Sequence, residues 1–169
     1  TDRFFYLNDL EETGIFNALG KLKGKWAEKG IELIVKIIEE IPKQETESEI
    51  FKTEDLFYLH DIDFFKVKTE NHSQLHFKED IYNLFKIFAL LIQSTIGTSC
   101  DQNAREIFDK NIKNLPDSQT LWRLKLFTLS LCPTIFEVDL KNELNRIFID
   151  SPQYGQLLMG TEYLKTLKK

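Results

Sequence analysis

Residues 78–96, KEDIYNLFKIFALLIQSTI, form the most apolar stretch of this chain of 169 residues. Its large apolar residues recur at helical spacing, which predicts a helix: Ile81, Leu84, Phe85, Phe88, Leu91 and Ile92. Apolar residues would lie on nearly every side of this helix. A helix that is apolar nearly all round packs in the centre of a fold. Gly97 follows directly, and we expect it to end this helix in the C′ position.

Three helices are predicted before this stretch. The first carries a single apolar stripe, with Gly20 and Gly24 in its middle: Leu10, Ile15, Phe16, Leu19, Leu22 and Trp26. The second runs over residues 31–41, between a break at Gly30 and a stop at Pro42. A shorter helix over about residues 53–65 lies between polar loops near 43–53 and 68–77.

Four more helices are predicted after it, over residues 102–114, 118–131, about 140–148 and from Pro152 onward. Asp101 and Ser118 are the expected N-caps of the first two. The chain is therefore predicted to be all-α, with about eight helices in antiparallel hairpins, either α-solenoid-like or a compact helical bundle. Residues 1–169 are read as a single domain or as a fragment of a longer helical-repeat protein.

Composition points away from several classes of protein. The net charge of −5 and the pI near 5.3 disfavour a protein devoted to nucleic acid. Cys100 and Cys132 are far apart and form no CxxC motif, so they predict free thiols in a reducing, intracellular compartment. No uncharged apolar run reaches the length of a membrane span, and we therefore expect no membrane partner.

No catalytic or metal-binding motif stands out. His72 and His76 have the i, i+4 spacing of helical metal ligands, but their segment lacks helical periodicity, so a solvated loop is the preferred interpretation. His60 beside acidic residues is interpreted as part of an exposed polar face. The prediction is a protein that is not an enzyme and has no metal or cofactor.

A short motif lies further along the chain, in residues 104–122. It reads Ala104-Arg105-x-Ile107-Phe108, then Pro116-x-Ser118, then Leu121-Trp122. It resembles the half-a-tetratricopeptide (HAT) repeat, although Asn111 stands where that family prefers Ala and no second clear copy is present.

The resemblance implies structural roles for these motif residues. A small Ala104 allows close helix approach, Ile107 and Phe108 fill the hairpin core, Ser118 caps the next helix and Trp122 covers the joint between the two helices. It also implies a nuclear scaffold in an RNA-processing or ribosome-biogenesis assembly, which holds partner proteins and takes RNA as a secondary partner.

Clustered aromatic residues are the candidate partner-binding sites: Phe4, Phe5, Tyr6, Phe64 and Phe65. Exposed aromatics are common anchors of protein interfaces, although a core would absorb them equally well. The predicted function is a non-catalytic helical scaffold or adaptor for partner proteins. The alternatives are a compact helical enzyme or small-ligand binder, and an RNA-binding module that uses basic residues: Lys21, Lys23, Lys25, Lys110, Lys113, Arg123 and Lys125.

Overall fold

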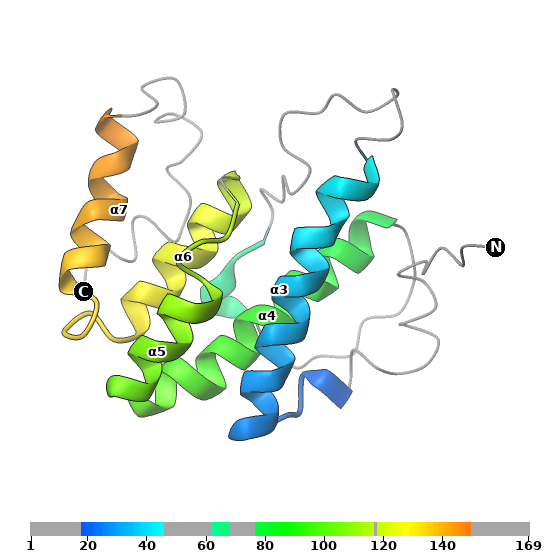
Figure 1. Ribbon diagram of the computed structural model, residues 1–169, viewed down its shortest axis with the longest axis horizontal. Helices are drawn as coiled ribbons and strands as arrows, with labels where there is room; N and C mark the ends of the chain where they lie inside the picture. The colour runs from blue at the N-terminus through cyan, green and yellow to red at the C-terminus, as the bar shows by residue number, and fades with distance from the viewer. Residues whose placement is uncertain (1–17, 46–61, 68–76, 117, 150–169) are drawn as a thin grey trace.

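The computed structural model describes residues 18–45, 62–67, 77–116 and 118–149. These residues form five α-helices and one 3-10 turn, and they contain no strand: α3 (Lys25–Glu45), η1 (Phe64–Lys66), α4 (Phe77–Ser99), α5 (Gln102–Asn111), α6 (Gln119–Leu131) and α7 (Glu137–Ile149). The predicted all-α class is confirmed. In Figure 1, α3 lies toward the right and α7 at the left, with α5 and α6 between them, and α4 passes behind α3. The expected helices before residue 18 and after residue 150 lie outside the described residues.

Helix α4 is the centre of the fold, as its sequence predicts. It packs against α3, α5 and α6, and its apolar residues are buried: Leu84, Phe85, Phe88, Leu91, Ile92 and Ile96 are each at or near zero exposure. Among the described helices, α4 alone has the length and mean hydropathy of a membrane span, over Ile81–Ser99. Burial of these side chains within the protein accounts for that hydropathy.

Helix α3 is longer than predicted at both ends. The chain turns at residues 20–24, where Gly24 has a φ of 55°, and Trp26 therefore belongs to α3 rather than to the preceding helix. The predicted break at Gly30 is wrong, because Gly30 lies buried inside α3. A Cβ there would lie 2.9 Å from Leu91 Cδ1, so the glycine permits close packing of α3 on α4. Pro42 falls within the helix and does not end it.

The end of α4 is also displaced from its predicted position. Gly97 lies inside the helix, which continues to Ser99. Cys100, with a φ of 44°, takes the left-handed conformation that was expected of the glycine. Ser94, Thr95, Thr98 and Ser99 each donate a hydroxyl hydrogen bond to a carbonyl three or four residues earlier. These bonds satisfy polar side chains in an otherwise apolar helix.

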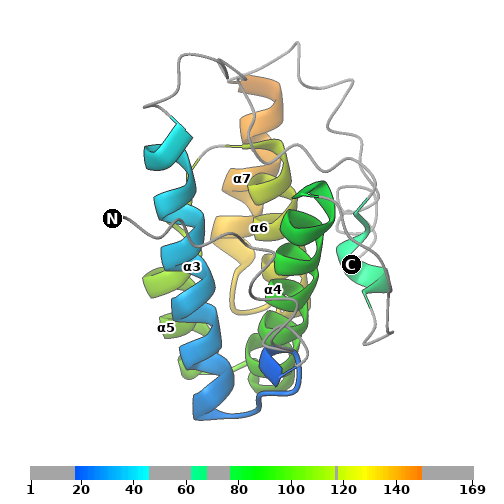
Figure 2. The same cartoon turned by 90° about the vertical axis from the view of Figure 1, so that its right-hand side faces the viewer.

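Helix α6 is buried on every side, since each residue from Thr120 to Ser130 is buried. It lies between α4 and α7, as Figures 1 and 2 show from two directions. The hydroxyls of Thr128 and Ser130 donate to carbonyls of their own helix, and Lys125 Nζ donates to the Leu115 carbonyl at 3.0 Å. The Arg123 guanidinium donates to the Ile62 carbonyl and holds the segment containing η1 against α6.

Candidate functional site

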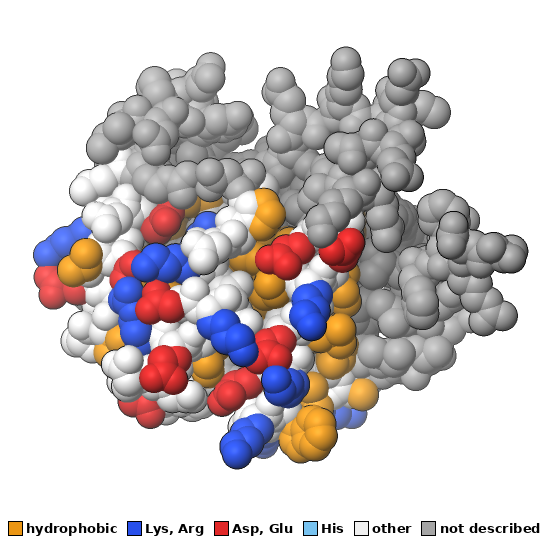
Figure 3. Space-filling view, in the orientation of Figure 1, with side chains coloured by type: hydrophobic (Ala, Val, Ile, Leu, Met, Phe, Trp, Pro, Cys, Tyr) orange, Lys and Arg blue, Asp and Glu red, His pale blue; other side chains and the backbone are white. Residues whose placement is uncertain are grey.

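The exposed side of α3 carries the largest exposed apolar side chains of the described residues. Trp26 is 72% exposed and Leu33 is 46% exposed, and with the half-buried Ile37 they follow one another at spacings of seven and four. Residues at these spacings lie on one side of a helix. Hydrophobic side chains are visible along α3 in Figure 3, with charged side chains beside them. We call Trp26, Leu33 and Ile37 the α3 stripe.

Lysines flank the α3 stripe. Lys29 Nζ and Lys110 Nζ each lie 2.6 Å from a carboxylate oxygen of Glu32. These two hydrogen bonds lower the pKa of Glu32 to about 2. Four further lysines form no ion pair with any residue that the structure describes, and all four are exposed: Lys21, Lys23, Lys25 and Lys36.

Ion pairs between helices tie α3, α5 and α7 together. Glu32 of α3 binds Lys110 of α5, and Arg105 of α5 binds Asp139 of α7 as well as Asp109 on its own helix. Burial raises the pKa of Asp109, but the hydrogen bonds and positive charges of Arg105 and Lys113 together outweigh burial, so the pKa lies below its usual value. These ion pairs thus link three helices at the protein surface.

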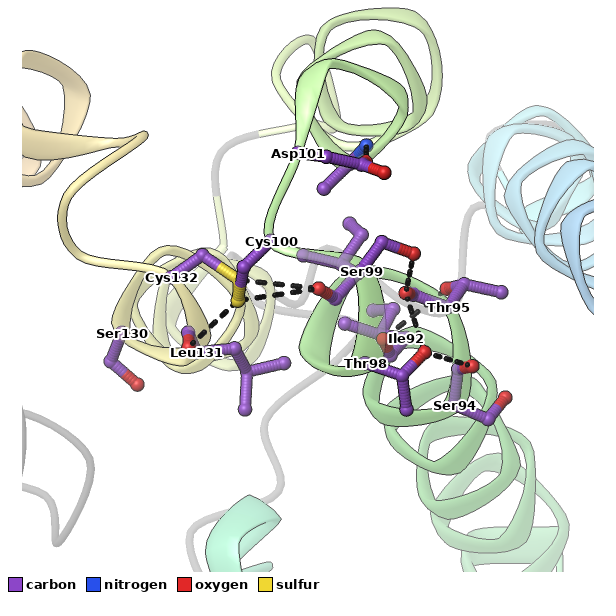
Figure 4. Close-up of a disulfide and its surroundings, with 12 residues drawn as sticks. Ile92, Ser94, Thr95, Thr98, Ser99, Cys100, Asp101, Ser130, Leu131 and Cys132 are labelled. Atoms are coloured by element: carbon purple, nitrogen blue, oxygen red, sulfur yellow. Dashed lines mark hydrogen bonds between the residues drawn. A yellow bond between two sulfur atoms is a disulfide. The ribbon is translucent and has the colours of Figure 1, made fainter.

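Cys100 and Cys132 form a disulfide, which corrects the prediction of free thiols. Their Cα atoms are 5.3 Å apart, although 32 residues separate them in sequence. Figure 4 shows the bond joining the residue after α4 to the residue after α6. Cys132 is buried, with its sulfur 3.2 Å from the Ile96 carbonyl oxygen, whereas Cys100 is exposed. Two helix ends that meet in space give no signal in the spacing of the cysteines.

The predicted aromatic sites are only partly described. Phe4, Phe5 and Tyr6 lie outside the described residues. Phe64 is buried and Phe65 is half-buried, with its ring 5.1 Å from that of Phe127. Their role as exposed partner anchors is therefore corrected: both pack on the core. Trp26 is the exposed aromatic that was missed, because its spacing from Leu19 and Leu22 placed it in a core stripe.

The motif residues 104–122 form α5, a turn and the start of α6. Ala104, Ile107 and Phe108 are buried, and Ser118 Oγ accepts a hydrogen bond from the Leu121 amide, as an N-cap does. Trp122 packs differently from the expectation: it lies with Leu126 against Leu140 and Leu144 of α7. Pro116 is exposed in the turn, and Arg105 forms the ion pairs described above.

The basic residues of the RNA-binding alternative do not form one surface. Arg123 and Lys125 are each only 4% exposed, so phosphate contact by them is excluded in this fold. Lys110 and Lys113 lie within reach of carboxylates. The histidines lie outside the described residues, and within those residues no three His, Cys, Asp or Glu side chains are grouped as metal ligands.

Comparison with known proteins identifies no relative: no protein-family model, curated protein or solved structure matches this chain.

Proposed function

We propose that this chain is a helical adaptor that binds partner proteins through the α3 stripe. The observation that carries the proposal is the exposure of Trp26, at 72%, on a helix that packs on two other helices. Helix α3 packs on α4 and α5, and Glu32 ties it to Lys110. A large aromatic fixed on a rigid surface is a common anchor of protein interfaces.

The finer proposal is that the helices stack as hairpins, as in HAT-like arrays, within an RNA-processing or ribosome-biogenesis assembly. The buried Ala104, Ile107 and Phe108 and the Ser118 cap support it, because these residues have the structural roles that the resemblance implies. The packing of Trp122 on α7 departs from that pattern.

The nuclear location that accompanies this proposal is in tension with the Cys100–Cys132 disulfide. Disulfides persist in oxidising compartments and are rare in the nucleus and cytosol. Alkylation of the chain in intact cells, followed by mass spectrometry of the two cysteines, distinguishes a reducing from an oxidising location. Free thiols support an intracellular assembly, and a formed disulfide supports an exported adaptor.

Affinity capture with matched variants tests the protein-binding function. Leu33→Asp places a charge in the α3 stripe, whereas Val138→Ser removes an apolar residue from α7 that is more exposed, 69% against 46% for Leu33. We expect wild type and Val138→Ser to retain the same partner proteins and Leu33→Asp to lose them. An identical set of proteins on all three baits would contradict the role of α3.

Contact with RNA is a second proposal, favoured by the exposed Lys21, Lys23 and Lys25 near the exposed Trp26; these lysines form no ion pair within the described part of the chain. Lysines bind phosphates, and a Trp ring stacks on unpaired bases. Binding of a fluorescent oligouridine should weaken steeply with added salt and should weaken in Trp26→Ser. No binding at low salt would exclude RNA contact by this surface.

A further inference from the structure

The Cys100–Cys132 disulfide has one end at the surface and one end in the core. Cys100 is exposed, whereas Cys132 is only 2% exposed. In thiol–disulfide exchange the attacking sulfur must approach one of the two bonded sulfurs directly, so a reductant in solution reaches Cys100 first. Exposed disulfides are the ones that open and re-form readily, whereas fully buried ones serve as permanent links.

The backbone at Cys100 reduces the stability that the bond provides. Its φ of 44° is the left-handed conformation, which costs free energy for any residue that has a side chain. Breaking the bond allows Cys100 to leave this conformation. The closed loop favours the bond, because it limits the freedom of the unfolded chain, and the backbone conformation of Cys100 offsets part of that gain.

The surroundings of the two sulfurs also suit the reduced state. Cys132 Sγ lies 3.2 Å from the Ile96 carbonyl oxygen, and Cys100 Sγ lies 3.6 Å from the Leu131 carbonyl oxygen (Figure 4). A disulfide sulfur carries no proton, but each thiol could donate a hydrogen bond to the carbonyl already beside it. Reduction therefore leaves the buried thiol with an acceptor, and α4 and α6 can remain packed in both redox states.

Cys132 is the residue at which the chain turns from α6 toward α7. Its carbonyl accepts hydrogen bonds from the amides of Ile135 at 3.1 Å and Phe136 at 3.2 Å, and the Phe136 carbonyl accepts from the Leu140 amide of α7 at 2.8 Å. Helix α7 packs chiefly on α6. The disulfide therefore attaches the start of α7 covalently to the end of α4, the central helix.

We infer that the Cys100–Cys132 bond is a redox switch that sets how firmly α7 is attached to the fold. With the bond formed, the turn before α7 is joined to α4. With the bond open, only noncovalent contacts hold this turn, such as the packing of the Phe136 ring on Phe108 at 5.0 Å, and α7 separates from α6 more often. The inference is independent of the proposed function, because it concerns α7 and not the α3 stripe.

The switch operates by two exchange steps with a thiol reductant such as glutathione. The thiolate of one reductant molecule attacks Cys100 Sγ, a new S–S bond forms between them, and Cys132 leaves with the electron pair and takes up a proton. A second thiolate then attacks the reductant sulfur of this mixed disulfide, and Cys100 leaves and is protonated in turn. Two cysteine thiols are formed, and two reductant thiols are oxidised to one disulfide.

Hydrogen exchange of the purified full chain in the oxidised and the reduced state tests the inference. Reduction should speed exchange of the α7 amides, Leu140 among them, at least about tenfold. In the reduced chain these amides should exchange before those of α4. The Cys100→Ser, Cys132→Ala variant should match the reduced chain and should not respond to reductant. Equal α7 exchange in both redox states, or α7 that exchanges only together with α4 after reduction, would overturn the switch.

Thiol chemistry tests the point of attack and the reversibility. In reduced wild type, iodoacetamide should alkylate Cys100 at least about tenfold faster than Cys132, because Cys132 is buried. Transfer between reduced and oxidised glutathione should open and re-form the bond while circular dichroism shows a folded chain throughout. Equal alkylation rates would contradict attack at Cys100, and a bond that opens only when the chain unfolds would show a permanent link instead of a switch.

Discussion

The sulfur atoms of Cys100 and Cys132 are bonded where the C-terminal ends of α4 and α6 meet. The bond closes a loop that contains the whole of α5 and of α6, because both helices lie between the two cysteines in the sequence. It also adds a covalent link between α4 and α6, which pack on each other and contain many of the fully buried side chains.

Removing the disulfide should destabilise the fold. A link across 32 residues limits the freedom of the unfolded chain, which corresponds to about 3–4 kcal/mol in the free energy of unfolding. The double variant Cys100→Ser, Cys132→Ala should show that loss in urea denaturation followed by circular dichroism.

Reductant provides the control for this prediction. Dithiothreitol should lower the stability of wild type to near that of the double variant and should leave the double variant unchanged. Wild type that is insensitive to reductant, with two alkylatable thiols, would show that the bond is not formed in the purified protein.

Glu32 should make the stability depend on acid pH. Hydrogen bonds from Lys110 and Lys29 lower the pKa of Glu32 in the folded state from 4.5 to about 2. A group with a depressed folded-state pKa contributes stability above its unfolded pKa and loses it as the pH falls. The contribution should therefore be complete above pH 4.5 and should disappear between there and about pH 2.

The variant Glu32→Gln removes this titration. Thermal unfolding of wild type and Glu32→Gln should differ most near neutral pH and should converge as the pH approaches 2. A constant difference between the two proteins over that range would show that Lys110 and Lys29 do not stabilise the carboxylate.

The central helices could be predicted from the sequence because periodicity reports burial directly. The apolar positions of α4 and the caps Asp101 and Ser118 follow from residue type and spacing alone. The break expected at Gly30 and the helix end expected at Gly97 were wrong, because both glycines lie inside helices. Gly30 permits close packing of α3 on α4, whereas Gly97 lies in α4 with room for a methyl group beside Leu131. Sequence spacing does not distinguish a glycine inside a helix from one that ends it.

The candidate site was less predictable than the fold. Trp26 has the spacing of a core residue relative to Leu22, and only the turn at residues 20–24 moves it onto the exposed side of a new helix. Phe64 shows the opposite case, since an aromatic in a short segment is buried by contact with α6, a helix distant in sequence. Both outcomes depend on tertiary contacts, which local patterns do not contain.

Two helical glycines should respond in opposite ways to alanine. Alanine favours a helix over glycine by about 0.5–1 kcal/mol. At Gly97 the new Cβ would lie 3.4 Å from Leu131 Cδ1, an ordinary contact, so Gly97→Ala should be stabilising by about that amount.

At Gly30 the new Cβ would lie 2.9 Å from Leu91 Cδ1 in the packed core, so Gly30→Ala should be destabilising by about 1 kcal/mol after the helix gain. Urea denaturation of both variants measures whether each substitution raises or lowers the free energy of unfolding. A Gly30→Ala protein that is as stable as Gly97→Ala would show that α3 and α4 have room to separate.

Arg123 should stabilise the segment around η1 from its buried position on α6. Its guanidinium donates to the Ile62 carbonyl and lies 5.9 Å from the centre of the Phe64 ring. Arg123→Met keeps the apolar stem but leaves that carbonyl without this donor, so the free energy of unfolding should fall by about 1–3 kcal/mol. Arg105→Met is the matched control, because Arg105 is more exposed and its ion pairs should contribute less, about 1 kcal/mol or below.

Hydrogen exchange separates a local effect from a global one. The Phe65 amide donates to Asp63 Oδ1 at 3.1 Å, and its protection should fall further in Arg123→Met than the protection of amides in α4. Equal losses in both places would mean that Arg123 stabilises the whole core. Unchanged protection at Phe65 would contradict its role in holding η1, because that amide lies next to the Phe64 ring that the guanidinium contacts.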